Sequence, residues 1–275
     1  MAHKFLLSVA LSMFVMQGTA FAGKDLSYSG SSTIGMAILE AGALKAYEQE
    51  TGKKFTLVEM PGSGKGIQAL LDGKVTIAGV SRPLKKEEKK QNLVDTVIGL
   101  DAIAIFVHID NPVKNLTKEQ LKGIFTGKIK NWKEVGGGDA PIEPNTEIAG
   151  AKRATMLEFQ ELVMDKAPYG AGFKEIDFPK DQIIETAKNK NTICTVSRGL
   201  LIKMSAYMRT KVKVVTVNGA SPLEADILSG AYIISRPLLL VTEGKPQGEA
   251  KQFIDFMLTP KGQNIVKINF VKLTK

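Results

Sequence analysis

Apolar residues recur along this chain with two different periods, and stretches of the two kinds alternate. Over residues 33–49 the apolar positions, such as Ile34 and Ile38, fall at helical spacing, which predicts an amphipathic helix. Residues 26–29 and 75–80 are instead short apolar runs of strand length. Strand, loop and helix follow one another through most of the chain. This order predicts an α/β fold, in which ligand loops follow the carboxyl ends of the strands.

The same two periods place the other elements. Further strands are predicted over residues 54–59, near Ile142, and over 193–197 and 212–217. Further helices are predicted over residues 67–71, 121–125, 155–164, 249–258 and 260–267. Thr117 and Gln120 have the spacing of a capping box ahead of the 121–125 helix. Residues 221–224 have the composition of another capped helix start, and Gly230 ends that helix.

Two long apolar segments, near residues 102–109 and 232–242, stand out as extended chain. They bracket a middle block that is flanked by two terminal blocks. One interpretation makes them paired crossovers between two lobes, the first formed by residues 23–108 and 236–275 and the second by residues 109–235. The other makes them two central strands of one sheet, and periodicity alone favours neither.

Three loops rich in small residues, at positions 30–33, 62–66 and 150–153, each open directly into a predicted helix. The first N–H groups of a helix lack partners within the helix and carry a partial positive charge. Glycine lets a ligand approach that backbone closely, and serine or threonine adds a hydroxyl. If the three loops converge, they form a cradle for a small oxyanion. If they do not, they are ordinary helix N-caps.

The N-terminus has the features of an export signal. Lys4 supplies a basic start, residues 5–16 are apolar, and residues 20–22 fit the small-x-small rule for cleavage. We predict cleavage after Ala22, so that residues 1–22 are removed and the mature protein is periplasmic. The apolar run is too short to remain as a membrane anchor.

The titratable residues narrow the possible chemistry. Cys194 is the only cysteine, so an internal disulfide is impossible. His3 falls in the predicted leader, which leaves His108 alone and excludes a site with several histidines. We therefore expect no metal and no cofactor. The formal charge of +9 either favours anionic ligands or reflects a lysine-rich surface, and the 7% of aromatic residues without basic runs argues against nucleic acid.

A family resemblance is carried by stretches spread over the whole mature chain: residues 30–34, 62–66, 81–84, 121–136, 230–238 and 253–262. In order and sequence they closely resemble the substrate-binding proteins of phosphate ABC transporters. The resemblance implies an α/β, two-lobed periplasmic binding protein fold of type II-like topology. Such a fold has two mixed β-sheets flanked by helices and a two-strand hinge that lets the lobes close over a ligand.

The resemblance also implies the residues that contact the ligand: Ser32, Thr33, Ser63, Gly64, Ser81, Arg82, Ala151, Lys152 and Arg153. The chain departs from the family pattern in three places, one of which is Thr76, where an aspartate is common. Relatives typically carry Ser-Gly-Thr in the last loop, often after an arginine, where this chain has residues 150–152 and Thr146. Some relatives place an acid at or near Ser81 to accept the proton of hydrogen phosphate, and this chain has none there. Charged donors from Lys152 and Arg153 would replace the missing hydroxyls.

Together these features predict a solute receptor that is not an enzyme. As a monomer, it would capture inorganic phosphate or a related oxyanion between two lobes and deliver it to an ABC transporter permease in the inner membrane. Two alternatives stay open. One is a module of the same fold with a different ligand or with a signalling or surface role. The other is a phosphoesterase that uses a loop serine such as Ser32 as its nucleophile.

Overall fold

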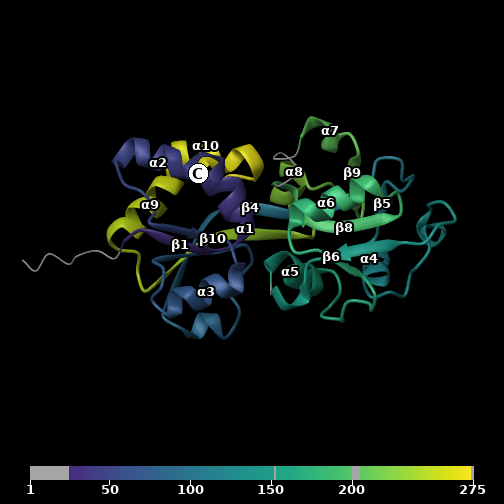
Figure 1. Cartoon of the computed structure of the whole chain (residues 1–275), viewed down its shortest axis with the longest axis horizontal. Coiled ribbons are helices and arrows are strands. Elements are labelled where there is room, and N and C mark those ends of the chain that lie inside the picture. Colours follow the sequence, from purple (N-terminus) through teal and green to yellow (C-terminus); the bar gives the residue numbers. More distant parts are fainter. Residues whose placement is uncertain (1–24, 152, 200–204, 274–275) are drawn as a thin grey trace, which may run out of the picture.

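The computed structural model describes residues 25–151, 153–199 and 205–273. Two groups of helices and strands lie side by side, and the long strands β4 (Leu93–His108) and β10 (Ser235–Glu243) run between them (Figure 1). The predicted two-lobed α/β fold is therefore confirmed. The predicted leader and its cleavage site after Ala22 lie outside the described residues. No helix in the described part of the chain has the length and apolarity needed to cross a membrane.

The first lobe is built on a mixed sheet with the strand order β2-β1-β3-β10-β4. Its shorter strands are β1 (Ser27–Gly30), β2 (Leu57–Glu59) and β3 (Ile77–Val80). Its helical segments are α1 (Ser32–Ile34), the π-helical η1 (Gly35–Ala43), α2 (Leu44–Thr51), α3 (Ser63–Leu71), the short 3₁₀ turn η2 (Glu88–Lys90), α9 (Gly248–Leu258) and α10 (Pro260–Asn269). Helix α3 covers one face of the sheet, and α2, α9 and α10 cover the other (Figure 1).

The second lobe is built on the continuation of β4, which pairs with β8 (Thr192–Ser197) and β9 (Val212–Val217). The other strands are β5 (Asn115–Leu116), β6 (Glu143–Thr146) and β7 (Lys174–Glu175). The helical segments are α4 (Lys118–Phe125), η3 (Trp132–Val135), η4 (Ala149–Ala151), α5 (Ala154–Leu162), α6 (Pro179–Lys188), α7 (Ala206–Arg209) and α8 (Glu224–Leu228). The capping box predicted from Thr117 and Gln120 is confirmed at the start of α4.

The register of β4 shows which strands the two long apolar segments pair with. The first part of β4 pairs with β10, where Leu100 lies opposite Pro237. The second part pairs with β8 and β9, where Phe106 lies opposite Cys194 and Val214. Thus β4 and β10 are neighbouring central strands of the first sheet, and β4 continues into the second, so each of the two interpretations was partly right. The lobe limits given above, 23–108 with 236–275 and 109–235, stay a proposal.

The side chains of β4 explain why residues 102–107 form an unbroken apolar run. Successive residues of a strand point to opposite faces, and β4 buries both. Ala104 and Phe106 belong to the core that also holds α9 and α10. Ile103, Ile105 and Val107 belong to the core beneath α4 and α5. A strand covered on both faces does not alternate with polar residues, which is why residues 102–107 of β4 are a continuous apolar run.

Helix α3 begins at Ser63, earlier than the predicted range of 67–71. Glycine is a poor helix former, so the glycines at its start masked the first turn. The structure shows why glycine is required in this first turn. A Cβ added to Gly66 would lie 2.5 Å from the Cα of Gly30, so only glycine permits the approach of α3 to the loop after β1.

Two other predictions are corrected. The helix expected over residues 33–49 is interrupted at Gly42, whose φ of 152° is not helical. The helix start expected at 221–224 is not capped by Ser221. That side chain donates to the carboxylate of Asp226 at 2.9 Å, and α8 begins at Glu224 without a side-chain cap.

Candidate functional site at the junction of the lobes

The small-residue loops of the first lobe meet through their serines. The hydroxyl of Ser31 donates to Ser81 Oγ at 2.9 Å, and the N–H of Ser81 donates to Ser63 Oγ at 3.2 Å. Ser31 is also the N-cap of α1, where its Oγ accepts the N–H of Ile34. All three serines are buried. The loops at 30–33, 62–66 and 81–82 therefore converge, and the first two of them belong to the three loops of the cradle hypothesis.

The predicted contacts Ser32 and Thr33 follow Ser31 directly, as the first residues of α1, and both are buried. Gly64 lies in the first turn of α3, where backbone N–H groups have no partner within the helix. Sequence reasoning passed over Ser31 itself. Its signal was available, since a serine just ahead of a helix is a preferred N-cap.

The loop of the second lobe faces this cluster. A Cβ built on Gly62 would lie 3.6 Å from the carbonyl oxygen of Ala151 and 3.6 Å from the Cγ of Arg153. Arg153 is the N-cap residue of α5 and is 6% exposed. The predicted loops of the two lobes are thus in close apposition. Lys152 lies outside the described residues.

The guanidinium of Arg153 is only partly paired. Its Nη2 donates to Asp177 Oδ1 at 2.8 Å, and its Cζ lies 5.4 Å from the ring centre of Phe178. Its Nε and Nη1 are buried and find no hydrogen-bond partner among the described residues. Two charged donors at the start of α5 are therefore available to an acceptor from outside the chain.

Arg236 lies next to this point and was not among the predicted contacts. Its Nε and Nη2 donate to Asp101 Oδ2 at 3.0 and 2.9 Å, and Nη2 also lies 3.3 Å from the hydroxyl of Thr33. Ser197 donates to the other oxygen of Asp101 at 2.9 Å. Burial raises the pKa of Asp101, while the charge and hydrogen bonds of Arg236 counteract that rise. Within the described chain, Nη1 of Arg236 has no partner.

Arg82, a predicted contact, is largely engaged elsewhere. Its Nη1 and Nη2 each donate to a carboxylate oxygen of Glu88 at 2.7 Å, and Nη1 also donates to the carbonyl of Pro83. Only its buried Nε has no partner in the part of the chain that is described. The structure therefore brings Arg82 to the site with one donor uncommitted.

A buried carboxyl group, that of Glu147, also lies here. Glu147 is 3% exposed, and its Oε2 accepts the N–H of Met156 at 3.0 Å, in the first turn of α5. Burial raises the pKa of Glu147 to about 7, although this hydrogen bond, Arg153 and Arg236 act to lower it, and Asp177 adds to the rise. Sequence reasoning missed Glu147, even though an acid just ahead of the 150–153 loop was visible.

Taken together, this junction is rich in donors. Four buried guanidinium nitrogens, from Arg82, Arg153 and Arg236, have no acceptor in the described residues. Leaving a buried donor unsatisfied costs about 1–3 kcal/mol, and more when the donor is charged. An oxyanion has several acceptor atoms and a compensating charge, so it is the kind of ligand that this arrangement favours.

His108, the acidic residues and the serines are the groups that a metal site or a serine nucleophile would use. His108 ends β4, where its Nδ1 accepts the N–H of Asp110 at 3.1 Å. The described residues include no group of three or more His, Cys, Asp or Glu side chains able to hold a metal ion. The hydroxyls of Ser31, Ser63 and Ser81 hydrogen bond to one another or to backbone N–H groups. None of these contacts is with a general base, as nucleophilic catalysis by serine requires.

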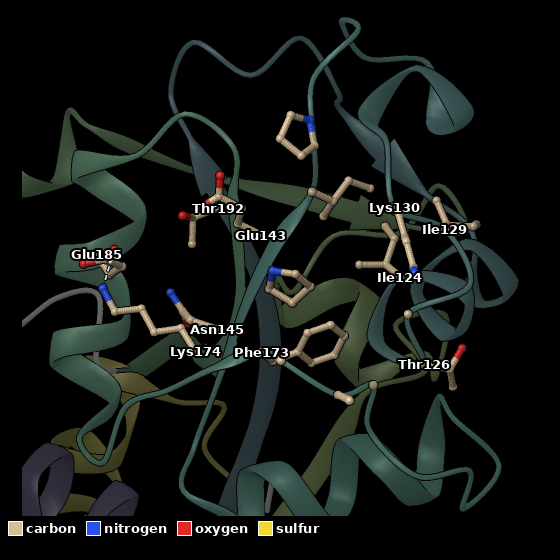
Figure 2. Close-up of a pocket in the computed structure, with 17 residues that line it drawn as sticks. Ile124, Thr126, Ile129, Lys130, Glu143, Asn145, Phe173, Lys174, Glu185 and Thr192 are labelled. Atoms are coloured by element: carbon tan, nitrogen blue, oxygen red, sulfur yellow. Dashed lines mark ion pairs between the residues drawn. The ribbon is translucent and has the colours of Figure 1, made fainter.

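A sizeable cavity of the described chain lies elsewhere, on the second lobe. Figure 2 shows this cavity of ≈ 540 Å³, whose lining includes Ile124 of α4, Asn145 of β6 and Phe173, with the Lys174–Glu185 ion pair at one side. None of the predicted contacts lines it. A second cavity of ≈ 450 Å³ is lined by Thr146 and by residues of α5. None of the predicted contacts lines this second cavity either.

Two lobes joined by long shared strands, with buried serines and arginines at their junction, define the class of two-lobed solute-binding proteins. Comparison with known proteins agrees. Residues 16–261 match the family model of the PBP superfamily domain. The phosphate-binding protein PstS of Borreliella burgdorferi is 31% identical over 256 residues, covering 89% of this chain and 88% of that protein. PstS of Bacillus subtilis is 30% identical, covering 91% and 80%.

Solved structures place the chain in the same group. A Clostridium perfringens protein, described as a phosphate ABC transporter substrate-binding protein and crystallised with bound phosphate, superposes with a TM-score of 0.79 at 32% identity, covering 91% of this chain and 100% of that one. An ABC-type phosphate transport receptor of Vibrio cholerae superposes with a TM-score of 0.76 at 26% identity, covering 90% and 100%. The chain belongs to the PBP superfamily and, within it, to the family of phosphate-binding proteins.

Proposed function

We propose that this protein captures phosphate or a closely similar oxyanion at the junction of its lobes and delivers it to an ABC transporter permease. The observation that carries the proposal is the set of buried guanidinium N–H groups left without an acceptor at this junction, among the residues the structure describes. The names of the relatives and the bound phosphate in the Clostridium perfringens structure support phosphate as the first ligand to test.

The proposed mechanism is closure of the lobes on the ligand. The first lobe offers Ser32, Thr33, Ser63, Gly64 and Ser81, and the second offers the loop at 151–153. An anion that bridges both sets is held more tightly in the closed form than in an open one. Ligand binding therefore shifts the population toward the closed form. The permease would recognise that closed form.

We also propose that the protein is exported to the periplasm and binds without turnover. The leader ahead of Ala22 supports export, and the relatives are named as binding proteins and not as enzymes. The phosphoesterase alternative lacks support from the geometry of the loops, because the hydroxyls of Ser31, Ser63 and Ser81 hydrogen bond to one another and to backbone N–H groups.

Isothermal titration calorimetry on refolded, ligand-stripped protein tests the proposal. We expect phosphate to bind, and Arg153→Met to weaken that binding about 10- to 100-fold, because a hydrogen bond to a charged group contributes roughly 1.5–3 kcal/mol. Methionine keeps the apolar stem and removes the donors. Arg209→Met, which removes an exposed guanidinium on α7, is the matched control and should leave the affinity unchanged.

Two results would count against the proposal, in different ways. Failure of phosphate, arsenate, sulfate and molybdate to give any heat would reject an oxyanion receptor altogether. Equal affinity of wild type and Arg153→Met for phosphate would leave the receptor in place but remove the start of α5 from its site.

A further inference from the structure

The last residues of the described chain, 270–273, follow α10 as an extended segment, which we call the C-terminal strap. Its Val271 pairs with Leu100 of β4: the N–H of Leu100 donates to the carbonyl of Val271 at 2.9 Å, and the N–H of Val271 donates back at 3.0 Å. On its other side Leu100 lies opposite Pro237 of β10. Because a strand has two hydrogen-bonding edges, the strap runs along the edge of β4 that faces away from β10.

The strap is held by the first lobe at both of its ends. Asn269, the last residue of α10, donates from Nδ2 to the carbonyl oxygen of Ala37 in η1 at 2.6 Å. The N–H of Leu273 donates to Oε1 of Gln263 in α10 at 2.8 Å. Both Asn269 and Gln263 are buried. The position of the strap is therefore fixed relative to the helices of the first lobe.

The strap contacts the second lobe through Phe270. Gly199 lies two residues beyond β8, and a Cβ added to it would lie 2.4 Å from Cε1 and 2.6 Å from Cζ of Phe270. Both residues are buried, so the end of the ring rests on the backbone of Gly199. Strand β8 pairs with the second part of β4 as far as Ser197, opposite Ile103. The end of β8 and the strap thus follow one another along β4 and meet at this contact.

Seen from the candidate site, this contact lies behind the junction of the lobes. The site is formed by the loops after β1 and β3 and by Arg236 of β10, whereas the strap lies beyond β4. Helix α10, which leads into the strap, covers the face of the first sheet opposite to α3, whose first residue is Ser63 (Figure 1). The lobes are joined by β4 and β10. A rotation about these strands that parts the loops of the site therefore presses Gly199 toward Phe270.

We propose that the C-terminal strap is a stop that limits how far the lobes open, through the contact of Phe270 with Gly199. The stop does not touch the ligand. It keeps the ligand-free protein near the angle at which the loops of both lobes reach an anion. The measured Kd rises as the fraction of free molecules near that angle falls. This effect on affinity rests on the function proposed above, whereas the effect on the opening angle does not.

Pulsed electron paramagnetic resonance on the full chain measures the opening directly. Gln68→Cys on α3 and Glu161→Cys on α5 provide one labelling position in each lobe, and both positions are exposed. Cys194, the only cysteine of the chain, is buried, so labelling is confined to the two introduced thiols. The distance between the labels is recorded without ligand and with inorganic phosphate.

Two substitutions change the stop from opposite sides. Phe270→Leu keeps the branch at Cγ and removes the Cε1 and Cζ atoms that meet Gly199. It should lengthen the ligand-free distance, leave the phosphate-bound distance unchanged and weaken phosphate binding in calorimetry roughly three- to tenfold. Gly199→Ala adds bulk at the same contact from the second lobe. It should shorten the ligand-free distance and should not weaken phosphate binding.

Phe256→Leu is the matched control for the loss of aromatic packing. Phe256 is buried in the same core as Phe270, and its ring packs against Tyr47 and Phe253, both of the first lobe. The substitution removes the same ring atoms without changing the contact with the second lobe. It should leave both distances and the affinity for phosphate as they are in wild type.

The outcomes separate the two proposals. Ligand-free distances that are equal in wild type, Phe270→Leu and Gly199→Ala would reject the stop, whether or not phosphate binds. The same lengthening in Phe256→Leu would also reject it, because loss of core packing would then be the cause. If one of the two strap variants does not fold, the other decides alone. Failure of wild type to bind phosphate would reject the receptor function and leave the distances to decide on the stop.

Discussion

Replacing Glu147 by glutamine should change how the stability of the ligand-free protein depends on pH. Glu147 has a pKa of about 7 in the folded chain because it is buried, compared with an ordinary value of 4.5. The folded state therefore binds the proton more tightly than the unfolded state does. Where the unfolded state holds fewer protons, the free energy of unfolding falls as pH rises. The fall begins near pH 4.5 and ends once the pH has passed about 7.

The size of the effect follows from the two pKa values. A pKa difference of one unit corresponds to about 1.4 kcal/mol, so the whole displacement lowers the free energy of unfolding by about 3 kcal/mol above pH 8. Between pH 5 and pH 8 the contribution of this one group is about 2.5 kcal/mol. Glutamine has no proton to lose, so Glu147→Gln should become more stable relative to wild type by this amount over that interval.

The assay is urea unfolding of both proteins at pH 5 and pH 8, in buffers free of phosphate and sulfate so that no ligand stabilises the fold. The measured quantity is the difference between the two free energies of unfolding at each pH, which cancels every other titrating group. Glu87→Gln, which removes an exposed carboxylate, is the control and should show a difference that does not change with pH.

A difference between wild type and Glu147→Gln that stays constant from pH 5 to pH 8 would refute the reasoning. It would mean that the carboxyl is as well solvated in the folded chain as in the unfolded one, despite its burial. A constant difference would also result if Arg153 and Arg236 outweighed burial, because the carboxyl would then be ionised at both pH values.

Two further substitutions test the framework around the site. Gly66→Ala should lower the free energy of unfolding by about 1–3 kcal/mol in urea unfolding, because its Cβ would overlap the backbone of Gly30. Gly138→Ala, whose Cβ would meet no described atom within 4 Å, should change it by less than about 0.5 kcal/mol; equal effects would contradict the close approach. Asp101→Asn should cost about 3–5 kcal/mol in the same assay, since it leaves the buried charge of Arg236 uncompensated. A loss under about 1 kcal/mol would show that the Asp101–Arg236 ion pair contributes little to stability at the junction of the lobes.

Much of the fold could be predicted from local patterns, because its elements bury one face or two with a regular period. The second half of β4 carries apolar residues on both faces without a break, from Ala102 to Val107, and the sequence shows that run directly. What could not be predicted was which strand each half of β4 would meet. That depends on pairings with β8, β9 and β10, which follow in the chain. The first turn of α3 was missed because Gly66 disfavours a helix locally and is required only by its contact with Gly30.

The candidate site likewise contains some residues that local sequence patterns predict and others that they do not. Ser63 and Ser81 were found because a small residue ahead of a helix or after a strand is a local signal, and the structure joins them. Arg236 was missed because its place in the site depends on Asp101, 135 residues away, and on Thr33, 203 residues away. Glu147 was missed because an acid in a loop is usually solvated, and only burial makes it distinctive.

Arg236 also shows that the candidate site and the junction of the lobes share hydrogen bonds. Asp101 on β4 fixes the guanidinium, Thr33 of the first lobe accepts a hydrogen bond from it, and Ser197 at the end of β8 holds the other oxygen of Asp101. Hydrogen bonds around one charge thus link both sheets. Rotation of the lobes would shift Ser197 relative to Thr33, whereas Asp101 keeps the uncommitted Nη1 of Arg236 in place. An anion held by this Nη1 and by Arg153 would in turn favour the one angle at which both contacts form.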